Sequence, residues 1–316
     1  MFCLILHGVV AVFFVASVVK VERNPQHCRK NAQVVAHGLL GFVLLIWPDL
    51  LLSVTVTGNF NALHAFLQSF TGIFHLALAA SLYRPDSGFS TKSSIFARAV
   101  TSFFVLFTRL FAAYHLSEKS TRGLLISDSF ILSTIIVDGV WFLTELVRFY
   151  QDQRKDQEEV DALCKKTTQW LEGKGSFYLE NALYIDSAIA LTMCLFHFAF
   201  PQNILKVIIR PEHTLDSHHY MWCRVFGCLW LLPALTSFAA INYQPADQLN
   251  HLFFRLLTQV GIFVLNMYGH WAVHLYSPNH ISAFMISGFF MSFHFSTFYR
   301  FKNHFEQEGN TKQPYD

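Results

Sequence analysis

The sequence of 316 residues is poor in charge: Asp, Glu, Lys and Arg together make up 14% of the chain, where soluble proteins carry about 25%. The formal net charge is only +2. No run of Lys or Arg is long enough to follow a phosphate backbone, so we expect no nucleic-acid partner. Hydrophobic residues take the place of charge, at 53% of the chain, and 34 residues are Phe. This composition predicts a protein of the lipid bilayer.

The sequence also lacks the short motifs that mark common enzymes. It has no phosphate-binding loop, G-x-S-x-G elbow or dinucleotide fingerprint, no C-terminal prenylation or lumenal-retention signal and no N-x-S/T sequon. Its six Cys show no CxxC or zinc-ligand spacing, and several stand in apolar stretches, where Cys acts as a small hydrophobic residue. We expect no cofactor. The absence of these enzyme motifs favours a non-enzymatic protein but does not decide whether the protein is an enzyme.

Apolar stretches of the length needed to cross a bilayer, roughly 20 residues, recur along the whole chain. They cover residues 2–19, 33–56, 62–82, 96–116, 125–148, 178–200, 220–241, 252–276 and 281–299. Turn-forming residues such as Asn24-Pro25 and Ser277-Pro278 separate them. We therefore predict an all-α fold, a polytopic transmembrane helical bundle of about nine spans.

The spans and the polar stretches between them divide the chain into five segments. They are an N-terminal anchor helix with a basic cytosolic segment (1–32), a first four-helix unit (33–150), a cytosolic polar linker helix (151–177), a second four-helix unit (178–303) and a short polar cytosolic tail (304–316). Because no basic residue precedes the apolar run 2–19, we expect an uncleaved anchor there rather than a signal peptide.

The distribution of Lys and Arg predicts the orientation of the bundle. With the N-terminus outside or lumenal, 15 of the 23 Lys and Arg residues fall on the cytosolic side and 4 fall outside, as the excess of positive charge in cytosolic loops requires. The C-terminus is then cytosolic. A location in the endoplasmic reticulum or the plasma membrane follows as an expectation.

The two halves of the chain resemble each other in collinear order, which predicts a duplication. The matches are Trp47-Pro48 with Phe200-Pro201, Ala79-Ala80-x-x-Tyr83-x-Pro85 with Ala239-Ala240-x-x-Tyr243-x-Pro245, Phe96-x-Arg98-x-x-Thr101 with Phe253-x-Arg255-x-x-Thr258, His115-Leu116 with His274-Leu275, and Arg148-Phe149 with Arg300-Phe301. This alignment places His64 opposite Arg224. Four spans per unit make the repeat parallel rather than inverted.

Two such units resemble the DoxX-like superfamily in tandem, over residues 33–150 and 178–303. The resemblance lies in a Pro that ends the first helix and a polar or basic residue early in the second, as in Cys223-Arg224-x-x-Gly227. The first unit departs from it, with His64 where Arg would be expected. The superfamily includes small-molecule-associated membrane subunits and membrane-protein assembly factors. The resemblance therefore implies a bundle with an interior pocket and does not imply one reaction.

Ionisable residues within spans should face the bundle interior and pair with one another, because charge is costly in lipid. In the first half, Arg98 and Arg109 share one helical face, and Asp138 and Glu145 share a face of the next span. Their depths in the membrane predict an Arg109–Asp138 pair, with Glu145 near Arg98. Such pairs either fix the register of two helices or form a polar site for a head group or ion.

In the second half, Arg255, Asn266, His270 and His274 fall on one face of the span 252–276. We expect Arg255 to pair with Glu180 or Asp186, which leaves His270 and His274 to line a cavity. The spacing of these two histidines can grip a metal, but the clustered His boxes of membrane di-iron enzymes are absent, so we predict no metal. The isolated His37, His75 and His197 should each be satisfied individually.

Together these patterns predict a non-enzymatic, multi-pass membrane protein that binds a lipid or small amphipathic ligand, or assists partner membrane proteins, through a polar-lined interior. The candidate binding residues are Arg98, Arg109, Asp138, Glu145, Asp186, Arg224, Arg255, Asn266, His270 and His274. Three alternatives stay open. They are a small-molecule or ion transporter, a chemosensory-type receptor, which would need seven spans, and a lipid-modifying enzyme.

Overall fold

The computed structural model describes residues 2–19, 25–55, 60–84, 91–118, 128–152, 156–173 and 178–311. In these residues the fold is all-helical, with no strand and one isolated antiparallel bridge between Ile209 and Tyr276. Several residues of the predicted linker and tail, among them Arg154, Lys155 and Lys174, lie outside the described part of the chain.

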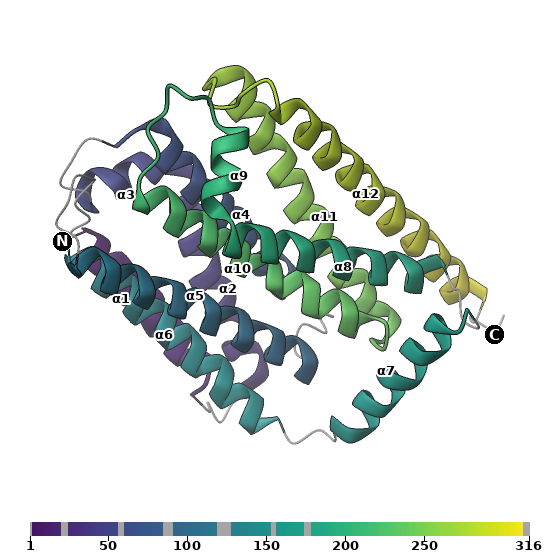
Figure 1. The fold of residues 1–316 in the computed structure, drawn as a ribbon. Helices are drawn as coiled ribbons and strands as arrows, with labels where there is room; N and C mark the ends of the chain where they lie inside the picture. The colour runs from purple at the N-terminus through teal and green to yellow at the C-terminus, as the bar shows by residue number, and fades with distance from the viewer. Residues whose placement is uncertain are drawn as a thin grey trace.

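In each half of the described chain, a long helix is followed by a helix of eight residues and then by three long helices, and the first half has one more helix before them (Figure 1). The first half contains α1 (Phe2–Ala16), α2 (Pro25–Ile46), α3 (Pro48–Thr55), α4 (Ala62–Tyr83), α5 (Lys92–Glu118) and α6 (Asp128–Gln151). The linker contains α7 (Asp156–Leu171), and the second half contains α8 (Tyr178–Ala199), α9 (Pro201–Ile208), α10 (Ser217–Ala240), α11 (Pro245–Met267), a π-helical turn (Tyr268–Ala272) and α12 (His280–Thr311).

Proline sets several of the helix starts. Pro48, Pro201 and Pro245 each stand at the first position of a helix, where the missing N–H costs nothing and the fixed φ angle already suits the helix. Pro48 and Pro201 also end the preceding helices, α2 and α8, and each begins a helix of eight residues, α3 and α9. Figure 1 shows α3 and α7 at opposite ends of the bundle.

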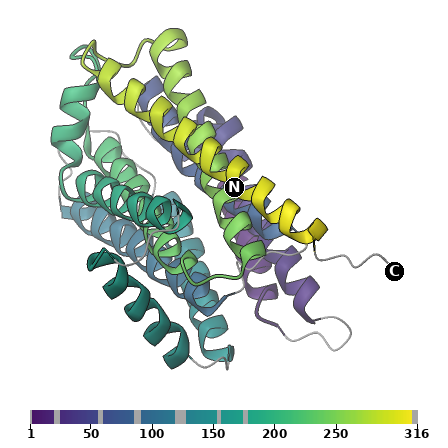
Figure 2. The same cartoon turned by 90° about the vertical axis from the view of Figure 1, so that its right-hand side faces the viewer.

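The helices α4 and α10 form the centre of the bundle, with most of their apolar residues buried. The helix α2 packs on α4, and α8 packs on α10. The remaining long helices cross between the halves: α5 packs on α6 and on α10, whereas α11 packs on α12 and on α4. The additional helix α1 packs on α6 and α2. Figure 2 shows the same packing from the side.

Glycine permits the closest of these contacts. A Cβ atom placed on Gly72 of α4 would lie 2.8 Å from the carbonyl oxygen of Gly41 on α2, and one on Gly41 would lie 2.7 Å from the backbone nitrogen of Leu76. The two backbones therefore touch at this crossing, an arrangement that small residues allow in membrane helix pairs.

Five of the described helical segments are long and apolar enough to cross a bilayer: α4, Lys92–Tyr114 of α5, α8, α10 and Pro245–Ala272. Large apolar side chains such as Phe107, Phe196 and Phe289 face outward, whereas Arg98, Glu145 and Arg255 are fully buried. This distribution is compatible with a membrane protein. Of the other expected spans, α1 is short and α2 begins with polar residues, and the count of nine stays a prediction.

One predicted span is interrupted. The stretch 252–276 does not form one helix, because α11 ends at Met267, the chain continues as a π-helical turn and His274 adopts a positive φ of 55°. A positive φ is uncommon for a residue other than glycine and ends a helix. The prediction that His270 and His274 share one helical face is therefore wrong.

Candidate functional site

Two ion pairs expected in the first half are present and join α5 to α6. The Nε atom of Arg109 lies 3.4 Å from Oδ2 of Asp138, and Nε of Arg98 lies 3.2 Å from Oε1 of Glu145. The guanidinium of Arg109 also stacks on the ring of Trp222 in α10, 4.2 Å from its centroid. These pairs follow from the cost of charge in an apolar bundle.

The Arg98–Glu145 pair belongs to a larger group that includes α2. The amide Nε2 of Gln33 donates to Oε1 of Glu145 at 2.6 Å, and Nη1 of Arg148 lies 3.5 Å from Oε2. Arg98 and Glu145 have no exposed side-chain surface. The group thus ties three helices together in the interior.

The second half holds an equivalent group with a different acid. Arg255 of α11 donates from Nε and Nη2 to the two carboxylate oxygens of Asp186 in α8, at 2.7 and 2.6 Å. Ser237 donates to the same carboxylate at 2.5 Å, and Nε2 of His294 in α12 lies 3.1 Å from it. Glu180, the other partner considered for Arg255, lies instead 3.8 Å from Lys166.

The structure does not bring the ten candidate binding residues into one site. Arg224 donates to the carbonyl of Phe198 at 3.3 Å, and Asn266 accepts a hydrogen bond from the hydroxyl of Tyr276 at 2.9 Å. His270 stacks loosely on His280, with 6.4 Å between ring centroids, and His274 is exposed. A ligand-binding role for these residues stays a prediction.

Two histidines expected to be satisfied individually form a pair. The Nδ1 atoms of His37 in α2 and His75 in α4 lie 3.0 Å apart, and both rings pack against Trp141. Such a contact needs one ring to donate and the other to accept, so their tautomers are complementary. His197 behaves as predicted, with Nδ1 positioned 2.8 Å from the carbonyl of Met193.

A cavity of about 310 Å³ lies between α4 and the helices of the second half. This volume is within the range of small-molecule pockets. Its walls are mostly aliphatic and aromatic, and the described lining contains no Asp, Glu, Lys or Arg. The polar side chains that line it are His197, Gln259, Asn266, Tyr276, His280 and Ser287. A second cavity in the first half, beside Arg109, Asp138, His7 and His75, measures only about 30 Å³, room for about one water molecule.

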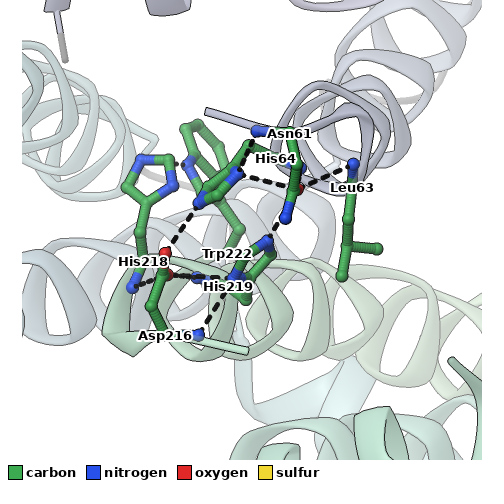
Figure 3. Close-up of polar contacts among 7 residues, drawn as sticks. All are labelled: Asn61, Leu63, His64, Asp216, His218, His219 and Trp222. Atoms are coloured by element: carbon green, nitrogen blue, oxygen red, sulfur yellow. Dashed lines mark hydrogen bonds and ion pairs between the residues drawn. The ribbon is translucent and has the colours of Figure 1, made fainter. Parts of the chain in front are cut away.

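The first turns of α4 and α10 meet in a polar cluster (Figure 3). Each helix begins with a capping box, in which the N-cap side chain accepts from backbone N–H groups and a histidine three residues later accepts from the N-cap N–H. In α4 the two residues are Asn61 and His64, and in α10 they are Asp216 and His219. The two starts therefore use the same local structure.

The two capping boxes also bond to each other. Nε2 of His64 lies 3.0 Å from Oδ2 of Asp216, and Nε2 of His219 lies 3.2 Å from Oδ1 of Asn61. The two imidazole rings lie against each other with centroids 3.7 Å apart and planes tilted by 36°. Burial raises the pKa of Asp216, but hydrogen bonds from His219 and His64 lower it by more, so the net pKa is below its usual value.

This cluster contains Asn61 and Asp216, which the sequence patterns do not single out. The alignment of the two halves placed His64 opposite Arg224, but the helix-start counterpart of His64 is His219. A signal was present in the spacing, since Asn61-x-x-His64 and Asp216-x-x-His219 both put a capping residue three positions before a histidine. Among the described residues, His64, Asp216 and His219 offer metal-ligand atoms that all lie within 4.8 Å of one another.

Comparison with known proteins gives a family but no function. No curated protein and no solved structure matches the chain. One family model matches residues 31–298, from within α2 to within α12. The chain therefore belongs to the family described as a domain of unknown function, DUF8292.

Proposed function

We propose that this is a non-enzymatic, multi-pass membrane protein that binds an uncharged, lipid-like amphiphile in the cavity of its second half. The observation that carries the proposal is the apolar cavity of about 310 Å³ between α4 and α8–α12. An apolar space of this size inside a helical bundle is the usual form of a small-ligand site.

The chemistry of the lining limits the ligand. An ionised head group would find no charged partner among the described lining residues, and burying an unpaired charge is strongly unfavourable. Neutral hydrogen-bonding groups gather at one place, where the hydroxyl of Tyr276 bonds to Asn266 and its ring stacks on His280 at 3.5 Å. A hydroxyl or ester head group suits these groups, so we expect a sterol, a fatty alcohol or a monoacylglycerol.

The proposal includes a tandem repeat of two parallel four-helix units, as in the DoxX-like resemblance. It is supported by the shared order of helices and by the position of the buried polar groups. Gln33 precedes Pro48 by the same number of residues as Asp186 precedes Pro201. Gln33 donates to the carboxylate of Glu145, which pairs with Arg98, the buried arginine of the first half. Asp186 pairs directly with Arg255, the buried arginine of the second half.

The repeat gives a reason why only the second half has a large cavity. In the first half, α1 packs beside α2 and α6 and inserts Phe14, which is fully buried against His37 and Trp141. The equivalent helices of the second half, α8 and α12, contact each other only weakly and both line the cavity. We infer that the ligand occupies in the second half the place that α1 fills in the first.

Binding of a fluorescent sterol and a fluorescent monoacylglycerol to the full chain in detergent tests the proposal. Ile262→Trp fills the cavity from α11, and Val260→Trp adds the same side chain on the exposed face of the same helix. We expect Ile262→Trp to weaken binding of the preferred probe at least tenfold and Val260→Trp to leave it unchanged. Equal binding by both variants, or no binding of either probe by the unmodified chain, would contradict it.

A further inference from the structure

We propose that His64, Asp216 and His219 form a binding site for a transition-metal ion, most suitably Zn²⁺, between the first turns of α4 and α10. The three side chains come from helices in different halves of the chain, and their ligand atoms lie within 4.8 Å of one another. Figure 3 shows the two imidazoles and the carboxylate turned toward one another. Two imidazoles and one carboxylate are a common ligand set for zinc.

Metal binding requires a change of tautomer in both histidines. In the metal-free arrangement, Nδ1 of each ring accepts from the N–H of its own N-cap residue at 3.1 Å, and Nε2–H donates across to the other helix. The same Nδ1 atoms also lie 2.9 Å from the side-chain oxygen of their own cap residue, Asn61 or Asp216.

Moving the ring proton from Nε2 to Nδ1 gives up two hydrogen bonds of each ring, from the N-cap N–H and to the other helix, and gains one hydrogen bond to the cap oxygen and one bond to the metal. The Nδ1–H group then donates to the cap oxygen, and the unprotonated Nε2 faces the space between the helices. A metal-binding imidazole whose other nitrogen donates to a carboxylate or amide oxygen is the usual outer arrangement of a histidine metal site. The capping residues would thus orient the ligands as well as begin the helices.

The ligand chemistry selects the class of metal. Mg²⁺ and Ca²⁺ prefer six or more oxygen ligands, which the cluster does not offer, whereas imidazole nitrogen favours Zn²⁺ and its neighbours. A tetrahedral zinc site needs a fourth ligand beside these three. Asp216 retains 22% exposure, so a water molecule can reach this position.

The positive ends of two helix dipoles oppose a cation here. At the magnitudes of partly buried helix termini, each start weakens binding of a single charge by up to about 30-fold, and of a divalent ion by more. Structural zinc sites bind tighter than this by many orders of magnitude, and the charge of Asp216 offsets the dipoles further.

In the predicted topology the cluster lies on the outer side, so the ion need not cross the membrane. The site would clamp α4 to α10 beside Leu63, which lines the large cavity.

Zn²⁺ titration of the metal-stripped full chain in detergent, followed by the unfolding temperature and by the absorption spectrum with Co²⁺ as substitute, tests the site. Asp216→Asn removes the charged ligand but keeps an equally good N-cap. His304→Ala, an exposed histidine far from the cluster in the sequence, is the matched control.

We expect Zn²⁺, but not Mg²⁺, to raise the unfolding temperature in a saturable manner, and Co²⁺ to give the intense spectrum of a four-coordinate site. Asp216→Asn should weaken binding at least tenfold, His304→Ala should not change it, and Asn61→Asp, which adds a second carboxylate, should tighten it. Absence of any Zn²⁺ effect, or equal affinity in the unmodified chain and Asp216→Asn, would overturn the proposal. Lipid-probe binding is measured separately, so failure here leaves the proposed function intact.

Discussion

Arg255 and Asp186 form a two-pronged hydrogen-bonded ion pair, at 2.7 and 2.6 Å, with less than a tenth of either side chain exposed. The carboxylate also accepts from Ser237 and contacts His294. Four helices, α8, α10, α11 and α12, therefore meet at one charged group. Such a pair adds little net stability compared with apolar residues of the same shape, but it is costly to break on one side only.

Breaking this pair on one side should strongly destabilise the protein. We expect Asp186→Ala to cost about 3–5 kcal/mol, because Arg255 is left buried without its counter-charge. The double variant Asp186→Leu/Arg255→Met should be less damaged than Asp186→Ala alone. Thermal unfolding in detergent, followed by tryptophan fluorescence, measures both. Asp49→Asn on the exposed face of α3 is the control, and an Asp186→Ala variant as stable as that control would contradict the argument.

The contact between α2 and α4 depends on the absence of a side chain at Gly72. Its added Cβ would lie 2.8 Å from the backbone oxygen of Gly41, which cannot move aside as a flexible side chain could. We expect Gly72→Ala to destabilise the protein by about 1–3 kcal/mol, as overpacking does. Gly139→Ala is the matched control, since its Cβ meets nothing closer than 3.9 Å and alanine favours the helix by up to about 1 kcal/mol. A loss in both variants would point to a general effect of added bulk.

The ion pairs could be predicted from the sequence because two strong constraints act together. Charge must turn away from lipid, and the helical period fixes which residues share a face. These constraints alone direct Arg109 toward Asp138 and Arg98 toward Glu145. They also leave only Glu180 and Asp186 as acids for Arg255, a choice that the structure settles in favour of Asp186.

The histidine contacts could not be predicted in the same way. His37 and His75 come from different helices, and nothing in their local sequence indicates the partner. The alignment that set His64 against Arg224 was anchored at Ala79-Ala80 and Ala239-Ala240, near the ends of α4 and α10. The two helices have different lengths between their caps and these anchors, so the register is lost at their starts. The large cavity depends on side-chain packing, which periodicity does not describe.

The lowered pKa of Asp216 predicts a loss of stability in acid. Because the folded carboxyl keeps its charge to lower pH than the unfolded one, whose pKa is near 3.8, its stabilisation is present above that value. It is lost as pH falls toward the folded pKa. Without metal, we expect the unfolding temperature of the unmodified chain to exceed that of Asp216→Asn at pH 6, and the difference to shrink as the pH falls to 3. A difference that stays constant with pH would mean that the charge of Asp216 contributes nothing.

The proposed topology predicts which parts of the chain face the outside. The segment Arg210–Leu215 joins α9 to the start of α10 and lies at the same end as the first turn of α4, whereas α7 lies at the opposite end of the bundle (Figure 1). The chain has no natural N-x-S/T sequon, so glycosylation of a variant with one introduced sequon shows on which side of the membrane that sequon lies. In microsomal membranes we expect glycosylation of a sequon inserted between Glu212 and Thr214 and none of one inserted after Leu171. The excess of Lys and Arg near α7 opposes its transfer across the membrane. Glycosylation only at the sequon after Leu171 would mean that the whole bundle is inverted. Glycosylation at both sequons would rule out the proposed membrane crossings of the bundle.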